Sequence, residues 1–390
     1  MLLDIQPMEI LVTQVRAQVI LVQVRELNVT EPVNLYLPLP EGLTRMGETM
    51  TVKQTNRKGE TFLHDQEIKQ DDSGLYLGFE NENGFPTFEL KVSKCSISKT
   101  NMRFGSDLSL LFAVEQDKVD GNGCYAKVTH NGKTVTISQK DWTQTVINET
   151  PYYTVEYSGI AGKQMSDPIT VQIFRQDGTK LTNLFETSVR QYAMSRLEKS
   201  TDDSFKTLIV DMLNYGASAQ QKFSYNTENP ANALLSEAQK ALGTKTMKPC
   251  QNELKSDGTY YHATNVRYDN SISMLFWMKN MTNDMSVKFS FVPFNSISGQ
   301  RKEVIINGED FTMVNSTDFA VELKDLKVTD ARQTITCEIY EHKNAEGHLL
   351  GTIQDSISSY VARKDAGERS QTLNDFMKFA DSAMDYVTNH

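Results

Sequence analysis

A long internal repeat constrains this chain more than any other feature of its sequence. Two copies of one pattern follow each other at an offset of between 164 and 169 residues. The clearest matches pair Tyr153–Glu156 with Phe319–Glu322, Pro168–Phe174 with Thr334–Tyr340, Ser188–Tyr192 with Ser356–Tyr360, and Asp211–Ala219 with Asp375–Ala383. The matched positions are mostly apolar or aromatic. Because duplicated catalytic machinery would repeat its polar residues, the pattern predicts a duplicated scaffold.

Size and charge limit the classes of protein to which the chain can belong. Its 390 residues are enough for two or three domains, and its 39% hydrophobic and 23% charged residues are typical of a folded protein. Proteins that bind nucleic acid cluster Lys and Arg to neutralise phosphates. This chain carries a net charge of −10, and its Lys and Arg are scattered. We therefore expect no nucleic-acid partner.

The N-terminal sequence predicts neither membrane insertion nor Sec export. The longest apolar stretch near the start, Val19–Val22, is far too short to span a bilayer. Asp4, Gln6 and Glu9 interrupt the region in which a signal peptide would be apolar. The expectation is a protein used without Sec export, and the alternative is a sequence from which a leader was removed.

Residues 1–98 have no counterpart in the repeat, and we expect them to form a small all-β domain. In Thr13–Val24, Val and Ala alternate with Gln and Arg, as on a strand with one buried face. Helical spacing of Leu11, Val15, Val19 and Val22 also fits, but the high valine content favours a strand.

Residues 99–247 and 248–390 are the two repeat segments. Strands are predicted in the first at Leu108–Val114, Cys124–His130, Thr134–Ser138, Tyr152–Tyr157 and Ile169–Phe174. Apolar stripes predict a helical pair through Phe185, Val189, Tyr192, Ala193 and then Phe205, Leu208, Ile209, Met212, Gly216, Ala219, Phe223. The second segment repeats the pair through Ile353, Ile357, Tyr360, Val361 and then Leu373, Phe376, Met377, Ala380, Ala383, Val387.

These patterns predict a β-rich α+β fold: an N-terminal all-β domain followed by two homologous modules, each a β-sandwich with a helical hairpin. Asn131-Gly132 predicts a tight hairpin between two of the strands. Residues 224–243, with a short helix at Leu234–Leu242, are expected to connect the modules. We expect the modules to follow one another in an elongated row.

The sequence contains no motif that identifies an enzyme. Its six His residues have neither HxH nor HExxH spacing, and nucleotide-binding and nucleophile-elbow motifs are missing. The acidic turn Asp117–Gly123 lacks the spacing of a calcium loop, so a hairpin turn is favoured. We expect no catalytic residue, metal or cofactor. Among the acids, only Glu156/Glu322 and Asp211/Asp375 recur; the first two are predicted to face solvent, and the others to lie on the outer face of a helix.

Aromatic and cysteine residues give few further indications. Tyr260, Tyr261 and Trp277 are the candidates for stacking on a ligand, with core or interface packing as the favoured alternative. Trp142 and Tyr153 match Phe311 and Phe319 across the repeat, which predicts core positions. The chain has four cysteines, at positions 95, 124, 250 and 337, and their wide spacing favours buried free thiols over disulfides.

The helical hairpin resembles repeated domains in large surface proteins of gut Clostridia-type bacteria. The resemblance rests on Tyr192–Leu197 (YAMSRL), Leu208–Gln220 (LIVDMLNYGASAQ) and Phe223–Asn232 (FSYNTENPAN), and it extends from about residue 107 to 390. In that family a DMLNYGAAAQ-like helix precedes a YNTDNLAN-like connector. The resemblance implies a structural or adhesive role without catalytic residues, and it provides no site residue.

Together these observations predict a non-enzymatic, surface-exposed structural or adhesion protein. Because the family is exported behind a leader and none is recognised here, the first expectation is a bacteriophage virion component, such as a capsid decoration, head-fibre or tail-associated protein. The alternative is a bacterial cell-surface adhesin or carbohydrate-binding scaffold module. Residues 1–98 are expected to contact other virion or surface proteins and to form a homo-oligomer, and a host glycan or protein is a further expected partner.

Overall fold

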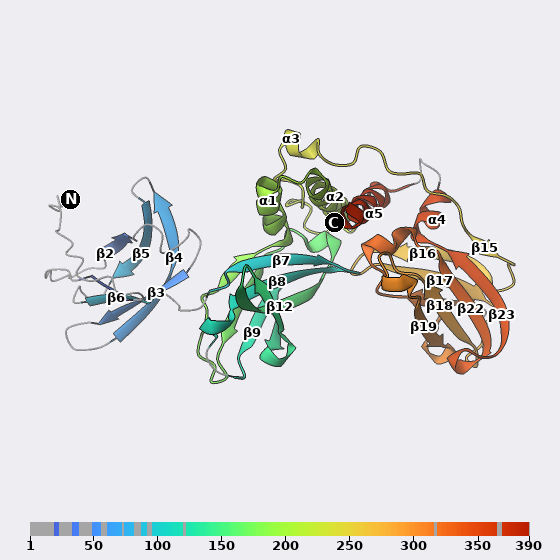
Figure 1. The fold of residues 1–390 in the computed structure, drawn as a ribbon, viewed down its shortest axis with the longest axis horizontal. Helices are drawn as coiled ribbons and strands as arrows, with labels where there is room; N and C mark the ends of the chain where they lie inside the picture. The colour runs from blue at the N-terminus through green and yellow to red at the C-terminus, as the bar shows by residue number, and fades with distance from the viewer. Residues whose placement is uncertain are drawn as a thin grey trace. The chain divides into compact units, whose positions relative to one another are not determined.

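A computed structural model describes most of the chain, and the fold is β-rich with a smaller helical part (Figure 1). The described residues are 96–389 without 120–121, 316–317 and 365–368, together with six strands of the N-terminal segment. The helices are few and the strands form several antiparallel sheets. The coarse class predicted from the sequence, β-rich α+β, is therefore correct.

The N-terminal segment contributes one antiparallel sheet. Its strands are β1 (Val19–Val22), β2 (Val33–Pro38), β3 (Thr49–Thr55), β4 (Thr61–Asp71), β5 (Gly74–Asn81) and β6 (Thr87–Lys91), in the order β1-β6-β3-β4-β5-β2. Val52, Ile68 and Leu77 are fully buried. The predicted strand Thr13–Val24 is seen from Val19 to Val22; the rest of it lies outside the described residues.

The first repeat segment forms two four-stranded sheets. The strands are β7 (Lys99–Phe104), β8 (Leu108–Glu115), β9 (Tyr125–His130), β10 (Lys133–Ser138), β11 (Thr143–Ile147), β12 (Thr150–Ile160), β13 (Ile169–Phe174) and β14 (Phe185–Thr187). They are ordered β10-β9-β13-β14 and β11-β12-β8-β7. Phe112 of one sheet meets Phe185 of the other edge-on, with 6.1 Å between ring centroids, so the sheets enclose a shared core.

The second repeat segment has the same strand order. Its strands are β15 (Lys255–Ser256), β16 (Tyr261–Arg267), β17 (Ser273–Lys279), β18 (Ser286–Phe291), β19 (Lys302–Asn307), β20 (Thr312–Met313), β21 (Asp318–Leu323), β22 (Ile335–His342) and β23 (Glu346–Asp355). The sheets are ordered β15-β23-β22-β18-β19 and β16-β17-β21-β20. Apart from the added β15, each strand has a counterpart in the first segment. Phe276 and Phe289, both fully buried, join the two sheets at 5.1 Å between ring centroids.

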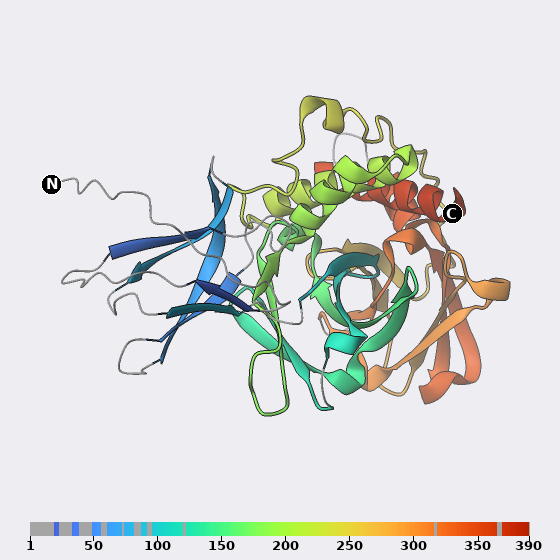
Figure 2. The same ribbon diagram turned by 60° about the vertical axis from the view of Figure 1, so that its left-hand side comes forward.

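Each segment contains a helical pair, and a serine caps the first helix of each pair. The helices are α1 (Val189–Lys199), α2 (Asp203–Lys222), α3 (Glu237–Lys240), α4 (Ile357–Ala362) and α5 (Gln371–Asn389). The Ser188 side chain accepts from the Gln191 amide before α1, and Ser356 accepts from the Ser359 amide before α4. Helices α2 and α5, one from each segment, pack side by side (Figures 1 and 2).

Several element predictions need correction. Phe185 and Ile353 were expected in helical stripes, but they lie in strands β14 and β23. The connector helix spans only Glu237–Lys240 instead of Leu234–Leu242. Strands β7, β11 and β14 were missed. In β11, four of five residues are exposed, so no buried face gives the sequence a period of two.

The chain divides into two compact units whose limits differ from those of the repeat. One unit is Met1–Thr100 with Phe112–Val155 and Pro168–Glu186; the other is Asn101–Leu111 with Glu156–Asp167 and Thr187–His390. The second unit therefore holds the five described helices and the described strands of the second repeat segment. Among the described helices, none is both long enough and apolar enough to cross a membrane.

Candidate functional site

The three aromatic residues proposed for ligand stacking do not form one platform. Trp277 lies on β17 and is partly exposed; the His262 ring stacks beside it, with 6.4 Å between centroids. Its indole Nε1 is buried and has no hydrogen-bond partner among the described residues. Tyr260 instead lies over the backbone of Gly351 in the other sheet, where an added Cβ would meet its ring at 2.9 Å. Tyr261, at the start of β16, pairs with Met278.

An arginine–glutamate pair recurs at the same place in both segments. Arg103 Nη1 donates to Glu156 Oε2 at 2.6 Å, joining β7 to β12. Arg267 Nη1 donates to Glu322 Oε2 at 3.3 Å, joining β16 to β21, and Ser273 Oγ donates to Glu322 Oε1 at 2.6 Å. The two glutamates, predicted to face solvent, are only partly exposed. In each pair the contact reaches across the strand that lies between the two joined strands, which is a structural role.

A tyrosine–asparagine hydrogen bond also recurs and attaches the first helix of each pair to a strand. Tyr192 Oη donates to Asn101 Oδ1 at 2.9 Å, and Tyr360 Oη donates to Asn265 Oδ1 at 3.1 Å. These polar repeats were missed because the copies were aligned on their apolar positions. The offset of 164 residues between Asn101 and Asn265, and between Arg103 and Arg267, was a readable signal.

Asp211 and Asp375, predicted on an outer helix face, are buried between α2 and α5. They are 1% and 8% exposed. Burial raises the pKa of both carboxyls, and hydrogen bonds oppose the rise. Thr244, directly after the connector, donates to Asp211 from its hydroxyl at 2.6 Å and its amide at 2.8 Å, and Ser382 contributes across the helix pair. At Asp375 the opposing bonds come from Ser218 across the pair and from Gln371. Since Ser218 and Ser382 are themselves repeat partners, the two contacts are related by an approximate twofold axis. The sequence prediction was wrong because the other copy covers the second face of each helix.

Aromatic rings fill the centre of this helical seam, which we define as the contact of α2 with α5. Tyr215 and Phe379, which are repeat partners, stack with 5.9 Å between centroids and 19° between ring planes. Phe104 meets Phe379 edge-on at 5.8 Å, and Tyr215 Oη donates to the Tyr268 carbonyl at 3.4 Å. Full burial raises the pKa of Tyr215, so its hydroxyl stays protonated.

A small cavity lies beside the seam and is too small for a substrate. Its volume is about 20 Å³, room for about one water molecule, and it is lined by Phe104, Asp107, Ile160, Tyr215 and Phe379 among others. Burial raises the pKa of the Asp107 carboxyl. Ligand pockets are typically far larger, so the cavity is best understood as imperfect packing between elements.

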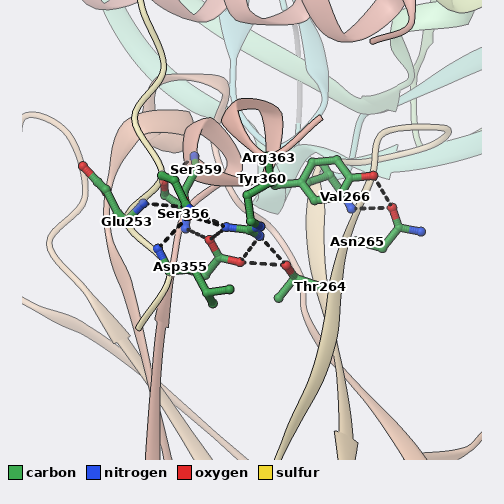
Figure 3. A network of polar contacts seen from close by, with 11 residues as sticks. Glu253, Thr264, Asn265, Val266, Asp355, Ser356, Ser359, Tyr360 and Arg363 are labelled. Carbon is green, nitrogen blue, oxygen red and sulfur yellow. Dashed lines mark hydrogen bonds and ion pairs between the residues drawn. The ribbon is translucent and has the colours of Figure 1, made fainter. Parts of the chain in front are cut away.

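The most extensive buried polar network centres on Asp355 and Arg363 (Figure 3). Arg363 binds both oxygens of the fully buried Asp355 carboxylate, Nη1 to Oδ1 at 2.8 Å and Nη2 to Oδ2 at 2.6 Å. Thr264 Oγ1 donates to Oδ2 at 2.7 Å, and the Ser356 amide donates to Oδ1 at 2.9 Å. Because each carboxylate oxygen already accepts two bonds, Asp355 has no lone pair left to act as a base.

The surroundings of Arg363 show what this network holds together. Arg363 Nη1 also donates to Ser359 Oγ at 2.7 Å, and the Glu253 amide donates to the same oxygen at 2.9 Å. Helix α4 and strands β16 and β23 thus meet at one guanidinium, and Glu253 in the chain before β15 joins them through Ser359 (Figure 3). At the equivalent positions the first segment has Thr187 and Ser195, so the network belongs to the second copy alone.

A second buried ion pair fixes α5. Arg332 Nε donates to Asp381 Oδ1 at 2.6 Å and Nη2 donates to Oδ2 at 3.0 Å. The same guanidinium donates to the Lys248 and Pro249 carbonyls, at 3.1 and 3.0 Å. Hydrogen bonding to Asp381 raises the pKa of Arg332 further above its ordinary value. The stretch of chain before β15 is thereby attached to α5.

The cysteines and the acidic turn form no catalytic or metal-binding arrangement among the described residues. Cys124 and Cys337 are buried, Cys337 as a free thiol as predicted, and Cys250 is a partly exposed free thiol. Cys95 and part of the acidic turn, Asp120 and Gly121, lie outside the described residues. Within the described part, no group of three or more His, Cys, Asp or Glu is placed to hold a metal ion.

Comparisons with known proteins add little to this geometry. No family model matches the chain, and no curated protein matches it. Among solved structures, the FN1–FN3 domains of chicken CNTN1 share 8% identity, with 89% of this chain and 97% of that one covered, at a TM-score of 0.18. A DUF4785 family protein from Legionella pneumophila shares 8% identity, with 87% and 86% covered, at a TM-score of 0.16. At such TM-scores neither likeness carries an argument.

Proposed function

We propose that this chain is a non-enzymatic structural or adhesion protein displayed on a surface, built from two homologous modules. The observation that carries the proposal is the set of polar contacts that recur in both segments. The Arg–Glu pairs join strands, the Tyr–Asn hydrogen bonds attach a helix to a strand, and the serine caps fix the start of the first helix in each pair. What duplication preserved is therefore a set of structural contacts, as expected for a repeated scaffold.

The proposed layout is an N-terminal β domain at 1–98 and modules at 99–247 and 248–390. Matching sheet orders in the two repeat segments support the homology. A superposition of residues 107–223 on 271–387 in an experimental structure tests it. The strands and the helical pair should align in one superposition. If either part failed to align, the proposed duplication would be wrong.

For location, we propose the surface of a bacteriophage virion, with a bacterial cell surface as the alternative. The resemblance of Leu208–Asn232 to bacterial surface repeats supports surface display in either case. Genes for capsid, portal or tail proteins beside this one, and labelling of purified particles by an antibody against the chain, are expected for the virion. Labelling of intact cells, or a cell-wall module in a longer reading frame, would establish the alternative.

The non-enzymatic assignment is tested separately. Purified chain is incubated with host and bacterial polysaccharides, and reducing ends are measured over time. We expect no release above the blank. Hydrolysis that persists through purification to homogeneity would overturn the proposal.

We further propose that residues 1–98 provide the main intermolecular contact. Open strand edges favour pairing with another chain. Deleting 1–98 should leave the repeat segments folded, with loss of oligomerisation and of incorporation into particles. Normal incorporation of the truncated chain would assign docking to the repeats instead.

A further inference from the structure

In β9, β10 and β13, one sheet face of the first repeat segment combines aromatic rings, hydroxyls and a lysine; the fourth strand of this sheet, β14, carries the exposed Glu186. In β9 and β13 the residues pointing to the core include Ala126, Val128, Val171 and Ile173, all fully buried. The strand pairings place the opposite face in three cross-strand rows: Ser138/Tyr125/Phe174, Thr136/Lys127/Gln172 and Thr134/Thr129/Thr170. All nine side chains are partly or fully exposed. We call these nine residues the Lys127 face.

The aromatic pair on this face holds the lysine in place. The Tyr125 and Phe174 rings stack with 5.4 Å between centroids and 10° between planes. Lys127 Nζ lies 5.0 Å from the Phe174 centroid and 5.9 Å from the Tyr125 centroid, within the range of a cation–π contact. Lys127 is exposed and forms no ion pair with a described residue. Its charge is therefore positioned but not neutralised, in a chain of net charge −10.

The second repeat segment contains the same lysine in a neutralised form. Lys288 occupies the equivalent ladder position on β18, opposite Glu338, whereas Lys127 lies opposite Gln172. Lys288 Nζ is 2.7 Å from Glu338 Oε2 and 4.0 Å from Glu303 Oε1. The aromatic partner is retained as Tyr340, at 5.7 Å, but Ser286 stands where the first copy has Tyr125. The two copies thus share a core and differ in the charge of this face.

We propose that the Lys127 face binds an acidic polysaccharide, with the lysine on its anionic group and the Tyr125–Phe174 pair against its sugar rings. The ammonium group binds a carboxylate or phosphate as a compact point charge. Aromatic side chains provide apolar contact area, and the threonine hydroxyls and the Gln172 amide provide donors and acceptors for sugar hydroxyls. The inference rests on the proposed surface function and names the ligand class that an adhesive module would bind.

Titration of the full chain with defined polymers tests this proposal. The probes are oligogalacturonate, which carries carboxylates, glycerol-phosphate teichoic acid, which carries phosphates, and a neutral galactan fragment. We expect saturable binding to one or both acidic polymers, weakened by added salt, and none to the neutral fragment. Carboxylate and phosphate as the recognised group are distinguished by which probe binds. No binding to either acidic polymer, or equal binding to the neutral one, would overturn the inference.

Matched lysine variants locate the site. Lys127→Gln should weaken binding by about tenfold or more, as expected for a lost charge-assisted contact. Lys288→Gln removes the same charge from the other copy and should change affinity by less than about twofold. Equal losses in the two variants would mean non-specific attraction of polyanions, and an unaltered Lys127→Gln would exclude the face. Because both lysines lie on sheet surfaces, thermal unfolding midpoints should stay close to that of the wild type.

A second measurement does not depend on substitutions. In oxidative footprinting of the wild-type chain, the acidic polymer should protect Tyr125 and Phe174 but leave Tyr340 unchanged. Protection of Tyr340 alone would place binding on the other copy and overturn the assignment. If the antibody against the chain labels particles or cells but the purified chain binds no acidic polymer, this inference is wrong and the proposed surface function stands. Cleavage of the polymer would instead overturn the proposed non-enzymatic function.

Discussion

Removing the ring of Phe379 should loosen the helical seam by a measurable amount. The side chain is 3% exposed and contacts both Phe104 and Tyr215. Truncating a buried phenylalanine to alanine costs about 3–5 kcal/mol, through lost burial and the cavity left behind. The cavity beside Phe379, about 20 Å³ in volume, would grow into the vacated space. We therefore expect Phe379→Ala to lower the stability of α2 and α5 by that amount.

The assay must resolve individual elements, because a chain with several domains need not unfold in one step. Native-state hydrogen exchange followed by mass spectrometry reports the opening free energy of each helix. Peptides from α2 and α5 should lose protection together in Phe379→Ala. Peptides from the six strands of the N-terminal segment should keep theirs.

A double-mutant cycle then tests the ring stack itself. Tyr215→Ala and Phe379→Ala remove the two partners of the stack, and an aromatic pair contributes about 0.5–1.5 kcal/mol beyond its buried area. The double variant should therefore cost less than the sum of the single variants by that amount. As the control, Tyr215→Ala is combined with Phe289→Ala, whose ring packs on Phe276 in the second sandwich. That pair should be additive within about 0.3–0.5 kcal/mol. Additivity of Tyr215 with Phe379 would refute the reasoning.

Three further predictions concern single positions. Burial raises the pKa of Asp375, so the stabilising contribution of its protonated form is present at low pH and is lost as pH rises through the raised pKa. Asp375→Asn should therefore reduce the fall of the urea unfolding midpoint between pH 4 and pH 7, and an unchanged pH dependence of the midpoint would contradict this. Gly216→Ala places a Cβ 2.6 Å from Met165 Sδ and 2.9 Å from the Ala231 Cβ. In denaturant titrations it should therefore lower the stability of α2 by about 1–3 kcal/mol, although alanine has the better helix propensity; a more stable variant would show that the neighbouring side chains move to make room. Arg363→Met leaves the buried Asp355 unpaired and should cost about 3–5 kcal/mol, whereas Arg363→Met with Asp355→Leu should recover much of the loss; equal losses in both would argue against an unpaired charge as the cause.

The strands that sequence patterns predicted well are those with one buried face. In β13, buried and partly exposed residues alternate strictly, and its predicted bounds match the structure. The hairpin between β9 and β10 was also predicted correctly, because Asn131 and Gly132 both have positive φ, at 50° and 72°. Two consecutive positive values are the requirement of the tight turn that Asn-Gly favours.

What could not be predicted depends on residues far away in the chain. The outer face of α2 looked solvent-exposed within its own repeat, yet α5 covers Asp211 from the other copy. Helical periodicity reports one buried face, and a second buried face adds apolar and polar residues that blur the pattern. The network around Asp355 likewise joins Glu253, Thr264 and Arg363, which no local spacing connects.

The comparison of the two copies also indicates where binding specificity can arise. Buried positions such as Phe112 and Phe276, and the recurring Arg–Glu and Tyr–Asn contacts, fix the backbone in both segments. With the strand register held by these contacts, side chains on the outer rows of a sheet can change without loss of fold, since surface substitutions usually alter stability by less than about 0.5 kcal/mol. The change from Gln172 opposite Lys127 to Glu338 opposite Lys288 is of this kind. In a duplicated scaffold, the repeated residues therefore identify the architecture, and the residues that differ at equivalent exposed positions are the better guide to what each copy binds.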